Sequence, residues 1–202
     1  MMKSILCAAA AAALPALAAA NAVVGQPAPA FSVTDTAGKP VSLADFKGRT
    51  VVLEWVNPGC PYVRKHYDSA NMQTTQKGAA DKGVVWLAVN STHPSHYDYR
   101  KPADLAGWMQ SQKAAATHTL MDADGKVGRA YGARTTPHMY IVDAKGTLAY
   151  AGGIDDKPSS NPADTKTARN HVSAALADIA AGRPVAQAAT RPYGCSVKYS
   201  DG

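Results

Sequence analysis

Three features of the sequence predict an α/β domain. Two short runs, residues 50–56 and 84–89, are dominated by apolar and β-branched residues, which is typical of parallel strands buried on both faces. Each run is followed along the chain by a segment of helical composition. Two further strands and an amphipathic helix complete the order strand, helix, strand, helix, hairpin, helix. We therefore expect helices packed on both faces of one sheet.

The first half of the chain contains a hairpin, a buried strand and a helix. Residues 31–34 and 39–42 flank a turn at residues 35–38, which predicts a short hairpin. Residues 50–56 form the first buried strand. Helical composition then extends from Cys60 to about residue 82.

The middle of the chain alternates in the same way. Residues 84–89 form the second buried strand, and residues 103–116 have helical composition. A short strand at residues 119–121 and about one and a half helical turns at residues 127–131 follow.

The C-terminal part begins with a second hairpin. Strands at residues 139–142 and 147–151 are joined by Asp-Ala-Lys-Gly, which is a natural hairpin turn. Residues 165–181 predict an amphipathic helix, which Gly182 ends.

The chain divides into three segments. Residues 1–22 predict a secretory signal peptide, because a short apolar run is followed by the small-x-small pattern Ala20-Asn21-Ala22. That run is shorter than the ~20 apolar residues that span a bilayer, so no membrane span is predicted. The domain covers residues 23–182, and a C-terminal tail covers residues 183–202. We expect an exported protein, either periplasmic or secreted.

Composition excludes several classes of function. The net charge of +6 is scattered, and its basic pairs do not lie among stacked aromatic residues, so no nucleic-acid partner is predicted. There is no glycine-rich phosphate loop and no dinucleotide fingerprint, so no organic cofactor is predicted.

Cys60 is the candidate nucleophile. It lies where a buried strand has ended and a helix begins, and Pro61 suits the first helical position, where its missing N–H costs nothing. The helix N-terminus would favour the thiolate, the nucleophilic form of the side chain. Arg64 and Lys65 would add to this effect if they point back toward the sulfur. The alternative is a buried, inert cysteine.

The segment from Trp55 to Tyr67, which reads WVNPGCPYVRKHY, resembles the active-site region of the thioredoxin/peroxiredoxin superfamily. Within that superfamily, the segment is most similar to a peroxiredoxin-like (redoxin, AhpC/TSA-type) branch. The resemblance extends over residues 24–181. It implies a thioredoxin-like three-layer sandwich with a mixed central sheet. It also implies a thiol oxidoreductase with antioxidant activity in cell redox homeostasis.

Two departures from the family pattern bear on the chemistry. Thioredoxins have a second cysteine where this chain has Val63, so no local dithiol can form. Peroxiredoxins have proline and threonine or serine where this chain has Leu53 and Asn57. Asn57 could still donate a hydrogen bond, but the peroxide-binding signature is missing. We therefore expect slow consumption of peroxide.

A second motif, Thr135-Thr136-Pro137-His138, precedes the strand at residues 139–142. By resemblance, Pro137 corresponds to the cis-proline of thioredoxins, which faces the cysteine and helps to hold the substrate backbone. Arg134 could replace the active-site arginine of peroxiredoxins. The alternative is an ordinary turn. The predicted substrate pocket comprises Asn57, Pro61, Arg64, Arg134, Thr136 and Pro137.

Cys195 is the candidate resolving thiol. With Cys7 in the signal peptide, only Cys60 and Cys195 remain, and Gly-Cys-Ser-Val-Lys at residues 194–198 also resembles the redoxin-like branch. The 13 residues from Gly182 to Cys195 reach roughly 43–47 Å, so the tail can return to Cys60. After attack on an oxidant or a disulfide, Cys195 would form a disulfide with Cys60, which a thiol reductant would reopen.

Two other functions stay open. A thioredoxin-fold protein could carry a structural Cys60–Cys195 disulfide without catalysis. A metal-binding or copper-handling redoxin could use Cys60 with His66 or His138, but copper-handling relatives would want a cysteine where this chain has Arg64. No metal site is predicted.

Overall fold

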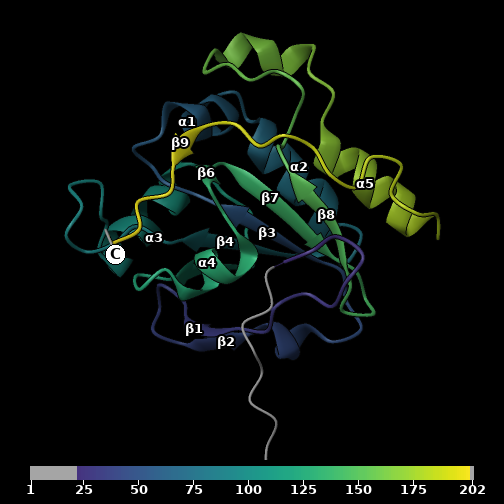
Figure 1. The fold of residues 1–202 in the computed structure, drawn as a ribbon. Coiled ribbons are helices and arrows are strands. Elements are labelled where there is room, and N and C mark those ends of the chain that lie inside the picture. Colours follow the sequence, from purple (N-terminus) through teal and green to yellow (C-terminus); the bar gives the residue numbers. More distant parts are fainter. Residues whose placement is uncertain (1–21, 201–202) are drawn as a thin grey trace, which may run out of the picture.

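The computed structural model describes residues 22–200, which form a central sheet between two layers of other elements (Figure 1). The five strands run in the order β5-β4-β3-β7-β8. Parallel pairing joins β3 (Val51–Trp55), β4 (Val85–Asn90) and β5 (His118–Met121), and antiparallel pairing adds β7 (His138–Val142) and β8 (Leu148–Gly152). The predicted α/β sandwich with a mixed central sheet is confirmed.

Four helices cover one face of the sheet. They are α1 (Pro61–Asp68), α2 (Asn71–Ala80), α3 (Pro102–Ser111) and α5 (His171–Ala180). Their apolar side chains share one buried cluster with inward residues of β3, β4, β7 and β8, and Cys60 belongs to that cluster. The thiol is therefore held by the core of the domain.

The opposite face is covered by smaller elements. Helix α4 (Lys126–Tyr131) packs there, together with the hairpin of β1 (Ser32–Thr34) and β2 (Pro40–Ser42) and the 3-10 helix that follows it (Leu43–Phe46). The first hairpin is therefore where the sequence predicted it. None of the helices in the described part of the chain has the length and apolar character that a membrane crossing requires.

Three predicted helices differ from the observed ones. The helix expected over residues 103–116 ends at Ser111, and Lys113 has a left-handed φ of 54°. The helix expected from Cys60 to residue 82 is broken at Ala70, whose φ of 60° is left-handed. Tyr67 and Met72 would lie about 140° apart around one continuous helix, and with the break at Ala70 both are buried. The helix expected over residues 165–181 begins only at His171, and the 3-10 turn Pro162–Lys166 precedes it.

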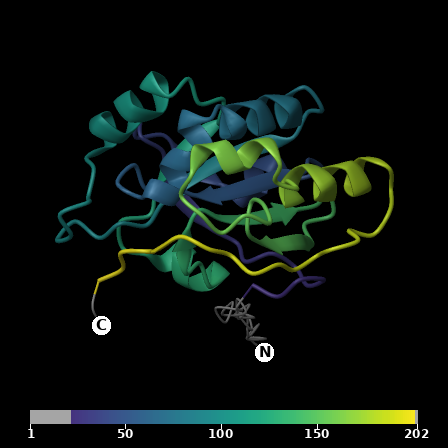
Figure 2. The same ribbon diagram turned by 90° about the horizontal axis from the view of Figure 1, so that it is seen from above.

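The tail returns to the sheet instead of leaving the domain. Figures 1 and 2 show it, in yellow, running from the end of α5 to the other side of the molecule. The backbone of Thr190 bonds to Ala151 of β8, and β9 (Cys195–Ser196) pairs antiparallel with β6 (Thr135–Thr136). Farther along, the carbonyl of Lys198 accepts from the N–H of His93, which lies in the loop after β4. The tail is thus fixed along its length.

Candidate active site around Cys60 and Cys195

Cys60 lies at the junction that the sequence predicted. Strand β3 ends at Trp55, α1 begins at Pro61, and Cys60 is the N-cap residue between them. Its N–H donates to the carbonyl of Asn57 at 3.0 Å, and its own carbonyl accepts from the first turn of α1. The residue is only 2% exposed. An inert cysteine would also be buried, so burial alone does not show the role of Cys60. The groups next to its sulfur are what distinguish the two cases.

The two sulfur atoms lie together. Both cysteines are free thiols, and the Sγ atoms of Cys60 and Cys195 are 2.8 Å apart. The carbonyl oxygen of Thr136 lies 3.0 Å from the sulfur of Cys60. Cys195 is directly opposite Thr136 in the register of β9 and β6. The pairing of these two short strands therefore places one thiol at the other.

The turn at Pro137 completes this arrangement. The peptide bond between Thr136 and Pro137 is cis, as the resemblance implied, and both residues are buried. Gly194 lies directly against this turn, with φ of 139°. A Cβ atom at position 194 would overlap the carbonyl of Thr136, so only glycine permits this approach. The hydroxyl of Thr136 has no hydrogen-bond partner among the described residues.

The remaining predicted pocket residues have other positions. Asn57 is buried, but its amide accepts from Gly59 N–H at 2.7 Å and donates to Thr92 at 3.3 Å, so it shapes the turn before Cys60. Arg64 and Arg134 are exposed, and neither guanidinium hydrogen-bonds to a thiol in the described chain. Arg134 instead contributes its backbone carbonyl, which accepts from the tail.

The surroundings of Cys195 oppose its ionisation. Burial raises the pKa of Cys195 to about 12, and its contact with Cys60 acts in the same direction. Lys198 opposes this effect. The thiol of Cys195 is therefore protonated at neutral pH while it faces Cys60.

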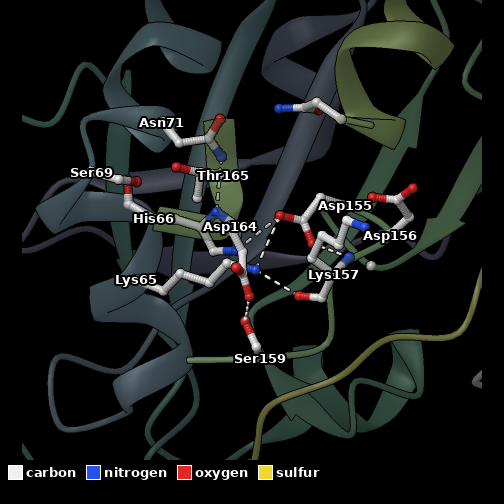
Figure 3. A network of polar contacts seen from close by, with 12 residues as sticks. Lys65, His66, Ser69, Asn71, Asp155, Asp156, Lys157, Ser159, Asp164 and Thr165 are labelled. Atoms are coloured by element: carbon white, nitrogen blue, oxygen red, sulfur yellow. Dashed lines mark hydrogen bonds and ion pairs between the residues drawn. The ribbon is translucent and has the colours of Figure 1, made fainter. Parts of the chain in front are cut away.

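A buried polar cluster beside the site was missed by the sequence analysis (Figure 3). Lys65 does not point back to Cys60. Its Nζ lies 3.2 Å from Oδ2 of Asp155, and both side chains are almost fully buried. His66 lies beside them, and its Nδ1 accepts from the amide of Asn71 at 2.8 Å. No local signal pairs residues 90 positions apart, so the sequence could not indicate this contact.

A second buried group, the carboxylate of Glu54 on β3, was also missed. It is fully buried and accepts hydrogen bonds from Tyr67, Gln76 and Trp86 at 2.9, 3.1 and 2.8 Å. Burial raises the pKa of Glu54 to about 7, although the three donors oppose that shift. The sequence did indicate this group. A single acidic residue within the apolar run 50–56 is buried with the strand, so its carboxylate needs hydrogen-bond donors inside the domain.

Glu54 makes the stability of the domain depend on pH. Between about pH 4.5 and 7 the folded protein holds a proton on Glu54 that the unfolded chain releases, so the contribution of Glu54 to the free energy of unfolding should fall as pH rises. The buried His66 and His138, whose pKa values burial lowers to about 4, contribute with the opposite sign, so the effect of Glu54 is the difference between wild type and Glu54→Gln. The loss should reach roughly 3 kcal/mol and level off above pH 7. Urea unfolding at several pH values measures it. Glu54→Gln should lose this slope, and Asp68→Asn, an exposed carboxylate on α1, should keep it. Parallel profiles for wild type and Glu54→Gln would contradict the assignment.

The histidines named for a metal are engaged in other contacts. The ring of His66 bonds to Asn71 and Tyr193, and Nδ1 of His138 lies 3.1 Å from the hydroxyl of Tyr140. Within residues 22–200 no group of three or more His, Cys, Asp or Glu side chains is arranged to hold a metal ion.

A thiol at a helix N-terminus, opposite a cis-proline turn at the end of a mixed sheet, defines a thiol protein of the thioredoxin fold. Over residues 24–151 the chain matches the AhpC/TSA family, and it belongs to that family. The chain is similar to the thiol:disulfide interchange protein DsbE of Pseudomonas aeruginosa, with 26% identity over 68% of this chain and 71% of the relative. It also resembles the thiol-disulfide oxidoreductase ResA of Bacillus thuringiensis, with 26% identity over 62% of this chain and 66% of the relative.

Solved structures share nearly the whole described domain. An uncharacterized conserved protein from Geobacillus kaustophilus has a TM-score of 0.78 at 27% identity, covering 89% of this chain and 94% of its own. A hypothetical protein from Sinorhizobium meliloti has a TM-score of 0.74 at 22% identity, covering 89% of this chain and 96% of its own. The second likeness establishes the fold alone.

Proposed function

We propose that this protein is an exported thiol-disulfide oxidoreductase in which Cys60 is the nucleophile and Cys195 the resolving thiol. The 2.8 Å separation of their sulfur atoms carries the proposal. Two thiols so close together are readily oxidised to a disulfide in an oxidising compartment. The names of the relatives from Pseudomonas and Bacillus support disulfide exchange as the reaction class.

The proposed reaction has two exchange steps. The thiolate of Cys60 attacks one sulfur of a substrate disulfide, forms a mixed disulfide and releases the other half as a thiolate. Cys195, after losing its proton, attacks the sulfur of Cys60 and releases the second half. The substrate gains two electrons and becomes two thiols, and the protein becomes the Cys60–Cys195 disulfide. A thiol reductant then regenerates the protein.

The order of the two cysteines follows from their surroundings. Cys60 is the N-cap residue of α1, next to the partial positive charge of the helix N-terminus. Cys195 is held protonated, partly by its contact with Cys60. Once Cys60 is in a mixed disulfide, its thiol no longer raises the pKa of Cys195. The second thiol therefore becomes easier to deprotonate at the step that needs it.

Disulfide exchange is favoured over efficient reduction of peroxide. Leu53 and Asn57 occupy the positions of the peroxiredoxin signature residues, and the amide of Asn57 is already engaged with Gly59 and Thr92. The two exposed arginines make no contact with the sulfur of Cys60. With a peroxide, Cys60 would form a sulfenic acid, and condensation with Cys195 would release water.

Export is part of the proposal because of Ala20-Asn21-Ala22. Of the predicted signal peptide, residues 1–22, all but the last residue lie outside the described part of the chain. On this proposal the mature protein begins at Val23. It then carries two cysteines, both of them at the candidate site.

A redox titration distinguishes the proposed enzyme from a structural disulfide. Oxidised protein should contain one Cys60–Cys195 disulfide by peptide mapping, and glutathione should reduce it while circular dichroism shows the domain still folded. A structural disulfide closing so long a loop would add about 4–5 kcal/mol, and its reduction should lower stability sharply. Two free thiols after oxidation would contradict the proposed function. Reduction that unfolds the domain would instead favour the structural alternative.

A further inference from the structure

The buried Lys65–Asp155 pair receives a side chain from the tail. The hydroxyl of Tyr193 donates to Oδ1 of Asp155, and it lies 3.1 Å from Nζ of Lys65 and 3.1 Å from Nε2 of His66. Lys65 and His66 belong to α1, and Asp155 follows β8 (Figure 3). The tail thus completes a cluster built by two elements of the domain.

The hydrogen bonds of this cluster are mutually consistent. Because the amide of Asn71 donates to Nδ1 of His66, a neutral imidazole carries its proton on Nε2 and donates to Tyr193. Burial lowers the pKa of His66 to about 4, so the ring is neutral at physiological pH. The hydroxyl of Tyr193 therefore accepts from His66 and Lys65 and donates to Asp155. All of its hydrogen-bonding capacity is used.

The ring of Tyr193 is held as firmly as its hydroxyl. It packs edge-on against Tyr62 with the ring centroids 5.9 Å apart, and Nζ of Lys65 lies 5.2 Å from its centroid. Both contacts come from α1, the helix that Cys60 caps. The position of Tyr193 is therefore fixed relative to the nucleophilic thiol.

Only Gly194 separates this side chain from Cys195. Gly194 lies against the carbonyl of Thr136, so the short link between Tyr193 and Cys195 has little freedom. Docking the hydroxyl therefore also sets the position of the second thiol. A thiol held in place reacts as if it were at high local concentration, which favours the intramolecular disulfide.

We infer that Tyr193 is a positioning residue, and that the cluster of Lys65, His66 and Asp155 is the receptor that holds Cys195 against Cys60. The inference rests on the proposed function and names the device that makes the tail cysteine an efficient resolving thiol. Tyr193 itself touches neither sulfur in the hydrogen-bond network and acts through the link to Cys195.

Tyr193→Phe tests the inference, because it keeps the ring and removes the hydroxyl. The equilibrium constant for forming the Cys60–Cys195 disulfide against glutathione should fall about tenfold, which is ~30 mV for a two-electron couple. In a Cys195→Ser background, iodoacetamide should alkylate Cys60 faster when Tyr193 is also phenylalanine, because the tail that covers the sulfur is released.

Tyr131→Phe is the matched control. Tyr131 is a buried tyrosine whose hydroxyl donates to the carbonyl of Pro29 at 2.9 Å, on the opposite face of the sheet. A merely structural hydroxyl would lower stability in both variants but shift the disulfide equilibrium in neither. We expect a shift in Tyr193→Phe alone. Equal equilibrium constants for the two variants would overturn the inference.

A second variant keeps the test decisive if Tyr193→Phe does not fold. His66→Leu removes one donor to the same hydroxyl from the α1 side, and it should shift the equilibrium in the same direction by a smaller factor. A folded His66→Leu with the wild-type equilibrium would contradict the inference. If wild type itself forms no reversible disulfide, the proposed function fails. If it does and Tyr193→Phe matches it, only the positioning role fails.

Discussion

Cys60→Ser is expected to abolish thiol-disulfide exchange, and Cys195→Ser is expected to trap the first intermediate. Without the nucleophile at the start of α1, a substrate disulfide meets only a protonated thiol at Cys195. Without the resolving thiol, the mixed disulfide on Cys60 has no internal route to release. The two variants should therefore fail at different steps.

Intact-mass analysis after reaction with glutathione disulfide separates these outcomes. Cys195→Ser should accumulate one glutathione adduct on Cys60, and Cys60→Ser should carry none. Ser196→Ala, which alters the neighbouring position of β9, is the control and should turn over as wild type does. An adduct on Cys195 in the Cys60→Ser variant would reverse the assigned roles.

Lys65→Met is expected to destabilise the domain by about 3–5 kcal/mol. The substitution leaves the carboxylate of Asp155 buried without its cation, and an unpaired buried charge is far more costly than the loss of a surface pair. Urea unfolding, with the midpoint and slope compared to wild type, measures the change. A loss comparable to that of an ordinary surface substitution would show that water reaches the cluster.

A double-mutant cycle isolates the charge pair. Lys65→Met combined with Asp155→Asn removes both charges while keeping an acceptor for Tyr193, so it should be more stable than the sum of the single losses predicts. Lys126→Met breaks an exposed pair with Asp124 and should change stability little. Additive losses for Lys65 and Asp155 would contradict direct coupling between the two side chains.

Short sequence patterns predicted the strands, the helix start and the turn that surround Cys60. The apolar runs of β3 and β4, the proline after Cys60 and the Thr-Pro before β7 each carry their signal within a few residues. They place the thiol at a strand end and the cis-proline turn beside it. The sandwich follows from the same pattern, because strands buried on both faces require helices on each side.

Contacts between distant residues could not be predicted in this way. Lys65 and Asp155 appear in the sequence as ordinary surface charges, and nothing near either residue indicates that they meet inside the domain. For the tail, the sequence predicted only that it is long enough to reach Cys60, because a Gly- and Pro-containing segment has many available paths. Its actual path depends on Thr190, Tyr193 and Gly194, each of which finds its partner only in the folded chain.

The pairing of β9 with β6 has a consequence for substrate access. The backbone groups of Thr135 and Thr136 that bond to the tail are unavailable to a second polypeptide while the tail is docked. On the proposed function, a protein substrate that binds this strand edge would compete with the tail, and a bulky partner would gain entry only at the rate at which the tail opens. Small disulfides need far less displacement to reach the sulfur. Turnover of protein and small-molecule substrates should therefore be limited by different events, strand release for the first and sulfur chemistry for the second.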